Sequence, residues 1–158
     1  MNTQELADRM ALKELVDKVS ILADKKDVQA QVQLFSENGI SETFAGDTAI
    51  LQLKGRKAME EAFGNLLKDY ETIYHFNGQQ QLTVHGDTAT GASYCLVTLI
   101  GMENDKRIKT TIGAVYHDHF IRENNSWLIA QRIGHFNWQE KCEVPPATLV
   151  SPMIPQIK

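Results

Sequence analysis

The fold of this chain is decided by residues 72–102, which read TIYHFNGQQQLTVHGDTATGASYCLVTLIGM. Two stretches rich in β-branched and aromatic residues flank Gly86-Asp87, a dipeptide that favours a tight hairpin turn. Two further stretches of the same kind follow, and each connection is short and turn-prone. The expected strands run roughly over residues 72–85, 88–102, 107–122 and 126–138. Long strands joined in this way predict an antiparallel meander.

Helical periodicity dominates the chain before these strands. Apolar residues recur at intervals of three and four from Leu12 to Ala23 and again from Met59 to Tyr70, which predicts two amphipathic helices. Asp27 is placed to cap a short second helix that reaches Phe35 and ends at Asn38-Gly39. Short strands are expected over residues 40–44 and 49–53. This order predicts an α+β fold: a cone-shaped, curved antiparallel sheet whose concave side is closed by three helices around a hydrophobic pocket.

The overall composition argues against several classes of protein. The chain has 158 residues, 42% of them hydrophobic, which predicts one globular domain with a substantial core. Its net charge is −4 and its basic residues form no long run, so we expect no nucleic-acid partner. No apolar stretch reaches membrane-spanning length, so no membrane partner is expected. Cys95 and Cys142 are too few for a disulfide framework, which favours a cytoplasmic location.

A change in composition marks the end of the folded body. All four prolines lie between Pro145 and Pro155, which predicts a domain over residues 1–143 followed by a Pro-containing extended tail over residues 144–158. The tail still carries several apolar side chains. We therefore expect it to pack on its own domain or on a neighbouring subunit. The apolar residues in question are Leu149, Val150, Met153 and Ile154.

Five stretches of the chain carry a resemblance to a known family. They are residues 21–27 (ILADKKD), 74–78 (YHFNG), 86–91 (GDTATG), 116–122 (YHDHFIR) and 127–129 (WLI). In sequence and in order they resemble the SnoaL-like branch of the NTF2-like superfamily, over about residues 5–140. The resemblance implies the cystatin-like α+β barrel. It leaves the activity open, since the superfamily includes dehydratases, isomerases, cyclases, epoxide hydrolases, a dehydrochlorinase and non-catalytic subunits.

The resemblance also implies a catalytic pair. In the scytalone dehydratase-like, bile-acid dehydratase-like and dehydrochlorinase members, an aspartate after the first helix holds a histidine at the start of the third strand, and Asp24 and His75 match these positions. That histidine removes a proton beside an activated carbon, and water or halide is eliminated. Val19 stands where the dehydratases have a tyrosine, and residues 97–99 lack their further His or Asp. A second proton-transfer group is therefore missing.

Taken without the resemblance, the same two residues have simpler interpretations. Helical periodicity puts Asp24 at the solvated edge of the helix end, where it would be a surface carboxylate or part of a cap. His75 shares a strand face with Ile73 and Asn77 and could be a core histidine bonded to a backbone carbonyl. Gly78 is expected to introduce a bulge, which would reverse the facing of the residues that follow it.

The last expected strand offers candidate substrate-binding residues. His135 and Asn137 share one face and Arg132 shares the other with Trp138, but the pattern does not say which face is inward. An inward Arg132 would suggest an anionic substrate group, and an inward His135 would supply a second proton carrier. Tyr94 on an earlier strand is either an electrophile or a core residue.

One further pair of histidines suggests metal chemistry at first sight. His117 and His119 alternate along a strand and so share a face about 7 Å apart, whereas Asp118 faces the other way. No further ligand has the required spacing, so we expect no metal site.

Two functions stay open at this point. The first is a cofactor-independent lyase or isomerase of the dehydratase or cyclase type, in which Asp24 and His75 act on a hydrophobic cyclic or polyketide-like molecule. The second is a non-catalytic ligand-binding or oligomerisation module. In either case the expected partner is a small apolar molecule, and exposed sheet surface predicts a homodimer or homotrimer.

Overall fold

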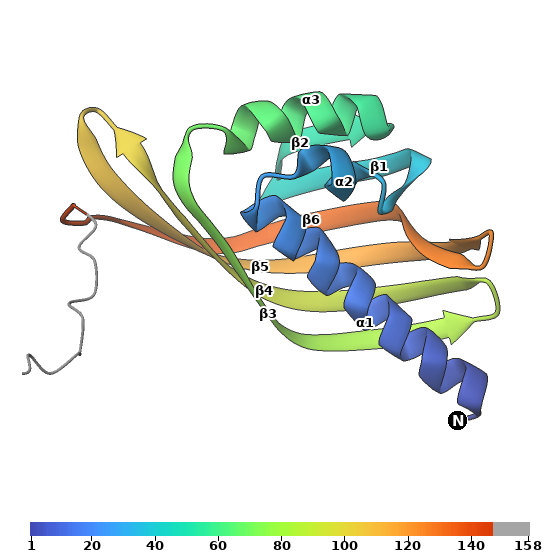
Figure 1. Cartoon of the computed structure of the whole chain (residues 1–158). Helices are drawn as coiled ribbons and strands as arrows, with labels where there is room; N and C mark the ends of the chain where they lie inside the picture. Colours follow the sequence, from blue (N-terminus) through green and yellow to red (C-terminus); the bar gives the residue numbers. More distant parts are fainter. Residues whose placement is uncertain (147–158) are drawn as a thin grey trace, which may run out of the picture.

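The computed structural model describes residues 1–146, and the tail residues 147–158, with the packing expected of them, lie outside this part (Figure 1). The described chain contains three helices and six strands. In order they are α1 (Thr3–Asp24), α2 (Val28–Val32), β1 (Phe35–Ala45), β2 (Thr48–Lys54), α3 (Arg56–Leu67), β3 (Tyr70–His85), β4 (Thr88–Glu103), β5 (Lys106–Glu123) and β6 (Ser126–Glu143).

The strands form one curved sheet in the order β2-β1-β6-β5-β4-β3, which confirms the expected α+β fold. The sheet differs from the expectation in one respect, because β1 runs parallel to β6 while every other neighbouring pair is antiparallel. After β2 the chain crosses through α3 to the far edge and enters β3. The meander then returns towards β1, so its last strand arrives beside β1 in the same direction. The sheet remains open between its edge strands β2 and β3.

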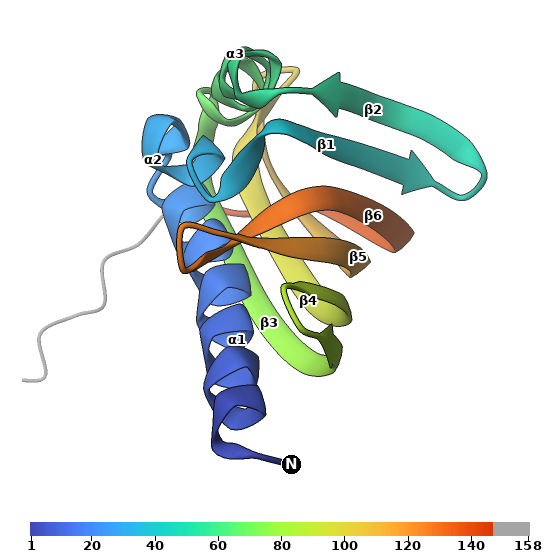
Figure 2. The same cartoon turned by 90° about the vertical axis from the view of Figure 1, so that its right-hand side faces the viewer.

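The helices cover one face of this sheet (Figure 2). The expected apolar stripe of α1 is buried against β3 and β6, with Leu12 and Val16 at its centre. Phe35 and Ile129 complete the same core from the sheet side. No helix within residues 1–146 is both long enough and apolar enough to cross a bilayer.

The second helix ends earlier than the sequence predicted. Helix α2 stops at Val32, and Phe35 already belongs to β1, where it is fully buried and pairs with Ile129. The register of β1 then shifts before Ile40. Within the shifted segment, a Cβ on Gly39 would lie 3.0 Å from the Ser36 carbonyl oxygen, so this close approach favours glycine. The expectation that Asn38-Gly39 ends a helix was wrong, because strand pairing prevails at this point.

The bulge expected at Gly78 is present. The pairing of β3 with β4 shifts between Asn77 and Gln80, which leaves two residues unpaired. Before the bulge His75 faces the helices, and beyond it Leu82 packs on the same core. The strand can therefore follow the sheet's curvature while keeping one continuous inward face.

The buried carboxylate of Asp8 connects the start of α1 to the hairpin between β5 and β6. Asp8 accepts hydrogen bonds from Trp127 Nε1 at 3.2 Å and from Arg122 Nη2 at 2.8 Å. The Arg122 guanidinium also lies 4.4 Å from the centre of the Trp127 ring. The hydrogen bond from Arg122 is the main reason that the pKa of Asp8 lies below its usual value.

Replacing Asp8 should therefore weaken the fold in a pH-dependent way. A group whose pKa is lowered by folding stabilises the protein above its unfolded value, near 4, and loses this contribution as the pH falls through the folded value. We expect Asp8→Asn to reduce the unfolding free energy by about 2 kcal/mol at pH 7, and the difference from wild type to shrink below about pH 4. Urea unfolding at pH 7, 5 and 3 measures this. A difference independent of pH would contradict it.

Asp87→Asn is the matched control. Asp87 also bonds Arg122, at 2.9 Å, but its side chain is 80% exposed. An exposed ion pair contributes little, so this change should lower stability by less than about 1 kcal/mol.

Candidate active site

Asp24 and His75 form a hydrogen-bonded pair between the end of α1 and β3. Asp24 Oδ1 lies 2.6 Å from His75 Nδ1, and the His75 backbone N–H donates to both carboxylate oxygens at 3.1 and 3.2 Å. Since an ionised carboxylate only accepts hydrogen bonds, Nδ1 carries the proton and Nε2 is the free, basic nitrogen of the ring. The carboxylate therefore fixes the orientation and the tautomer of His75.

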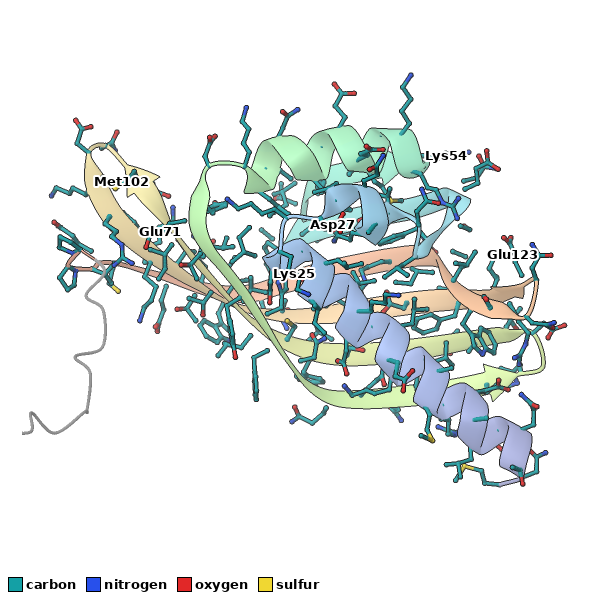
Figure 3. The ribbon with its side chains drawn as sticks, viewed as in Figure 1. Lys25, Asp27, Lys54, Glu71, Met102 and Glu123 are labelled. Carbon is teal, nitrogen blue, oxygen red and sulfur yellow. The ribbon has the colours of Figure 1, made fainter. Side chains whose placement is uncertain are left out.

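The local sequence brings the helix end to this position. Lys26 adopts a left-handed conformation (φ 57°) that ends α1, and Asp27 caps α2 through the Ala30 N–H. Lys26 Nζ donates to the main-chain carbonyls of Lys68 and Tyr70, which tethers this turn to the start of β3. Figure 3 marks the turn by Lys25 and Asp27. The helix edge that periodicity predicts to be solvated thus meets β3, and the Asp24 side chain is only 22% exposed.

His75 lines two adjoining chambers between the helices and the concave face of the sheet. The outer chamber, about 430 Å³, is mostly apolar and reaches the end of α3. Besides His75 its walls include Ile50, Leu66, Leu67, Tyr70, Val97, Leu99, Ile112, Phe136 and Trp138, with Lys141 among the polar lining residues. The inner chamber, about 170 Å³, reaches under α1 and α2 and is lined by Val19, Ser20, Gln31, Phe35, Ser41, Tyr116 and Arg132, among others. The His75 side chain is 14% exposed.

A buried ion pair forms the floor of the inner chamber. Arg132 Nε and Nη2 donate to the two Asp118 carboxylate oxygens at 2.7 and 2.9 Å, and the guanidinium lies 4.4 Å from the centre of the Tyr116 ring. Burial alone would lower the pKa of Arg132, but the charge and hydrogen bonds of Asp118 hold it above its ordinary value. Arg132 is therefore a permanent cation whose charge Asp118 balances.

The other titratable groups beside this pair keep their protons. Burial is the main cause that raises the pKa of Tyr116 far above its usual value. Burial likewise raises the pKa of the Cys95 thiol to about 11, so Cys95 is not a thiolate nucleophile at neutral pH.

The structure separates the sequence-predicted site residues into two groups. Arg132 lies on the inward face with His75, and Trp138 shares that face. Tyr94, His135 and Asn137 line a different pocket, of about 420 Å³, on the uncovered face of the sheet. There His135 stacks on Phe44, with ring centres 5.7 Å apart, and meets the edge of His117 at 5.5 Å. The sheet itself stands between these residues and His75, so His135 is not in reach as a second proton carrier.

Several residues of the chambers were not singled out from the sequence. Gln31 follows Val28 by three positions on α2, a spacing that could have placed it on the buried face. Ser41 and Tyr116 carry no comparable signal, since their facing depends on the register of β1 and β5. Val19 and Val97 both lie in the chamber walls. Within residues 1–146 no cluster of three or more His, Cys, Asp or Glu side chains has the geometry for a metal ion.

The buried ion pair predicts a sharp dependence of stability on Asp118. We expect Asp118→Asn to lower the unfolding free energy by about 3 kcal/mol, because it leaves the Arg132 charge buried without its partner. The double variant Asp118→Leu/Arg132→Met should recover most of this loss. Urea unfolding of the three proteins measures it, and a loss below about 1 kcal/mol in the single variant would contradict it.

Comparison with solved structures finds the same architecture in several proteins. A Novosphingobium aromaticivorans protein provisionally assigned as a scytalone dehydratase superposes with a TM-score of 0.78 at 15% identity, covering 98% of this chain and 100% of that chain. A type 2 hexachlorocyclohexane dehydrochlorinase LinA gives 0.74 at 21% identity, covering 95% and 97%. An NTF2-like protein with a cystatin-like fold, also from N. aromaticivorans, gives 0.66 at 25% identity, covering 84% of each chain. At this identity the first two likenesses show the fold alone.

A comparison with curated proteins gave no match. The model of the SnoaL-like domain, by contrast, matches residues 4–133, which is most of the chain and includes α1, α2, α3 and every strand up to the middle of β6. The chain therefore belongs to the family of SnoaL-like domain proteins.

Proposed function

We propose that this protein is a cofactor-independent lyase of the dehydratase type, in which His75 is the general base and Asp24 holds it. The observation that supports this most directly is the 2.6 Å contact between Asp24 Oδ1 and His75 Nδ1 at a side chain that lines both chambers. A base needs a free nitrogen, a fixed orientation and access to the substrate, and this arrangement supplies all three. Proteins of the same fold whose names denote a dehydratase and a dehydrochlorinase support the proposal.

The proposed step is an elimination that balances within the chamber. His75 Nε2 takes a proton from a C–H bond beside an activating group, and that bonding pair becomes the new C=C bond. The leaving group on the adjacent carbon departs with its own bonding pair. If it leaves as hydroxide, it takes the proton from the imidazolium and becomes water, which returns His75 to its starting state. The Asp24 carboxylate stabilises the intervening imidazolium.

The chambers favour an apolar cyclic substrate. Their walls are largely aliphatic and aromatic, and the outer volume of about 430 Å³ lies in the range of ordinary small-molecule sites. Most of the binding free energy would then come from burying ring carbon atoms. Arg132, His75 and Lys141 are charged or ionisable groups of the lining that are placed to meet a polar substituent.

The dyad is tested by paired variants. Native mass spectrometry of the protein with a library of cyclic alcohols and ketones identifies a ligand, and NMR then follows solvent deuterium entering that ligand. We expect His75→Gln to slow this exchange at least 100-fold, and Asp24→Asn at least 10-fold, while both variants still bind. His135→Gln changes a histidine on the opposite face and should leave the rate unchanged. Exchange rates within twofold of wild type for all three variants would instead favour a non-catalytic binding module. The apolar side chains of Val19 and Val97 in the chamber walls are the observation that favours this alternative.

We also propose that the chain forms a homodimer or homotrimer through the uncovered face of its sheet. Four large apolar side chains are exposed there on adjacent strands, with Phe76 directly opposite Leu96. A contiguous patch of this kind is unusual for a monomer. The patch comprises Tyr74, Phe76, Tyr94 and Leu96. The cytoplasmic location, and the absence of nucleic-acid and membrane partners, stay predictions.

Light scattering tests this assembly. We expect a mass two or three times the chain mass of 17.8 kDa, and a shift towards that single-chain mass in Phe76→Lys. Met10→Lys is the control, because Met10 is exposed to a similar degree but lies on α1. A wild-type mass near that of one chain would refute the proposal.

A further inference from the structure

Arg132 has one nitrogen that its ion pair leaves free. Nε and Nη2 of the guanidinium donate to Asp118, and Nη1 has no partner within residues 1–146. Among the buried and half-buried residues of that range, Gln31 Oε1 is the single polar side-chain atom with neither accessible surface nor a partner, so Nη1 keeps accessible surface. Arg132 as a whole is only 7% exposed, and the space that it lines is the inner chamber. Its Nη1 hydrogens can therefore meet a group inside that chamber.

The other accessible polar groups of the inner chamber are able to donate as well. Ser20 is already paired, because it exchanges hydrogen bonds with Asn77. The amide nitrogen of Gln31, like Arg132 Nη1, has accessible surface and no partner in the described part of the chain. Three hydroxyls can each donate or accept, and they belong to Ser41, Thr43 and Tyr116. Only His75 Nε2 is restricted to accepting. The chamber therefore suits a ligand that brings an acceptor.

The charge of the ion pair selects the kind of acceptor. Asp118 already balances Arg132, so the pair carries no net charge. A carboxylate held beside it would add a negative charge to a buried site without a second cation, which is costly. A neutral carbonyl oxygen accepts the charge-assisted hydrogen bond from Nη1 without adding any charge. The pairing with Asp118 therefore favours a ketone over the anionic substituent that an inward Arg132 suggested from the sequence.

The size of the inner chamber limits how far this oxygen lies from the base. Its volume of about 170 Å³ is close to that of an apolar cavity of about 150 Å³ that accepts one benzene molecule. One six-membered ring therefore fits there, and any further ring extends into the outer chamber. Arg132 and His75 both line the inner chamber, so one ring can meet Nη1 through its oxygen and His75 Nε2 through a C–H bond.

We propose that Arg132 Nη1 is the electrophile of the proposed elimination, and that it donates a hydrogen bond to the ring carbonyl oxygen that activates the C–H bond. The substrate class is then a cyclic ketone whose leaving group lies on the carbon β to the carbonyl. This role rests on the proposed function in taking the chambers as the substrate site.

The step balances through an enolate. When His75 removes the proton, the C–H bonding pair forms a C=C bond to the carbonyl carbon, and the C=O π pair moves onto the oxygen. Nη1 stabilises the negative charge that develops there. As that pair returns to the carbonyl, the C=C bond shifts to the neighbouring carbon and the leaving group departs with its own bonding pair. Arg132 keeps its proton throughout.

Three bicyclic probes test which group Arg132 recognises. They are 2-tetralone, the hydrocarbon tetralin and the carboxylate 1,2,3,4-tetrahydro-2-naphthoate, with dissociation constants measured by ligand-observed NMR. The variant is Asp118→Leu/Arg132→Met, which removes Nη1 without leaving a buried charge unbalanced. The affinity ratio of ketone to hydrocarbon should fall about tenfold relative to wild type, and the ratio of carboxylate to hydrocarbon should fall less. A larger fall for the carboxylate would overturn the ketone assignment. An unchanged ketone ratio would mean that Nη1 donates to bound water only, which also overturns it.

Deuterium exchange into the positions beside the 2-tetralone carbonyl tests the catalytic part. At saturating ketone we expect the double variant to slow this exchange at least 100-fold. Tyr116→Phe, Ser41→Ala and Gln31→Met each remove another donor of the chamber and should slow it less. A larger loss in one of these three would assign the carbonyl oxygen to that donor and overturn the role of Arg132.

A measurement on the wild-type protein covers the case in which the double variant does not fold. The probe is 2-tetralone labelled with ¹³C at the carbonyl. A hydrogen bond draws electron density from the carbonyl carbon, so its bound resonance should lie downfield of its position in cyclohexane. A bound resonance at the cyclohexane position would mean that no donor meets the oxygen and would overturn the inference.

The two proposals can fail separately. Repeating the titration in His75→Gln measures recognition in a protein without the general base. If the ketone ratio falls in the Arg132 variant while His75→Gln keeps the wild-type exchange rate, the elimination is wrong and the recognition stands. If His75→Gln loses exchange and the ketone ratio does not move, only the role of Arg132 is wrong.

Discussion

The hydrogen bonds between the Asp24 carboxylate and His75 are the constraint on which the arrangement of the site depends. The carboxylate accepts hydrogen bonds from the ring and from the backbone of one residue, 51 positions along the chain. The backbone contacts fix β3 under the end of α1, and the ring contact fixes the base in the space that this leaves. Because α2 starts two residues after Lys26, the same junction also sets the roof of the inner chamber. The position of His75 and its chemical role therefore both depend on the Asp24 side chain.

In the inner chamber the ionisable groups near His75 each keep one protonation state, which leaves His75 as the side chain that transfers protons. Arg132 keeps its charge because Asp118 balances it, and burial keeps Tyr116 and Cys95 protonated. These groups supply a fixed field without exchanging protons near neutral pH. Sequence reading noticed the Arg132 strand but not this division of roles, because the partners come from β4, β5 and β6 and meet only once the strands are in register.

Local patterns predicted the parts of the structure that local physics controls. The α1 stripe, the long hairpins and the bulge at Gly78 follow from side-chain periodicity and turn chemistry. Phe35 was misassigned because its helical spacing competes with a strand pairing to Ile129 that lies far away in sequence. The inward face of β6 was undecidable for a similar reason, since alternation gives two faces and only packing against α1 selects one. Gln31 was missed because its place in the inner chamber depends on how α2 packs over the sheet.

The apolar residues that replace the expected partners of the dyad limit the chemistry further. Val19 and Val97 line the chambers at the positions expected of those partners, and neither side chain can protonate a leaving oxygen. If elimination releases water without a proton from Tyr116 or Lys141, which also line the chambers, the proton removed from carbon returns through the same imidazole. A single nitrogen reaches both atoms only when hydrogen and leaving group lie on one face of the ring. The proposed reaction is then a same-face elimination, and deuterium placed on either face of a cyclic alcohol would distinguish it from the opposite-face course that two separate groups would allow.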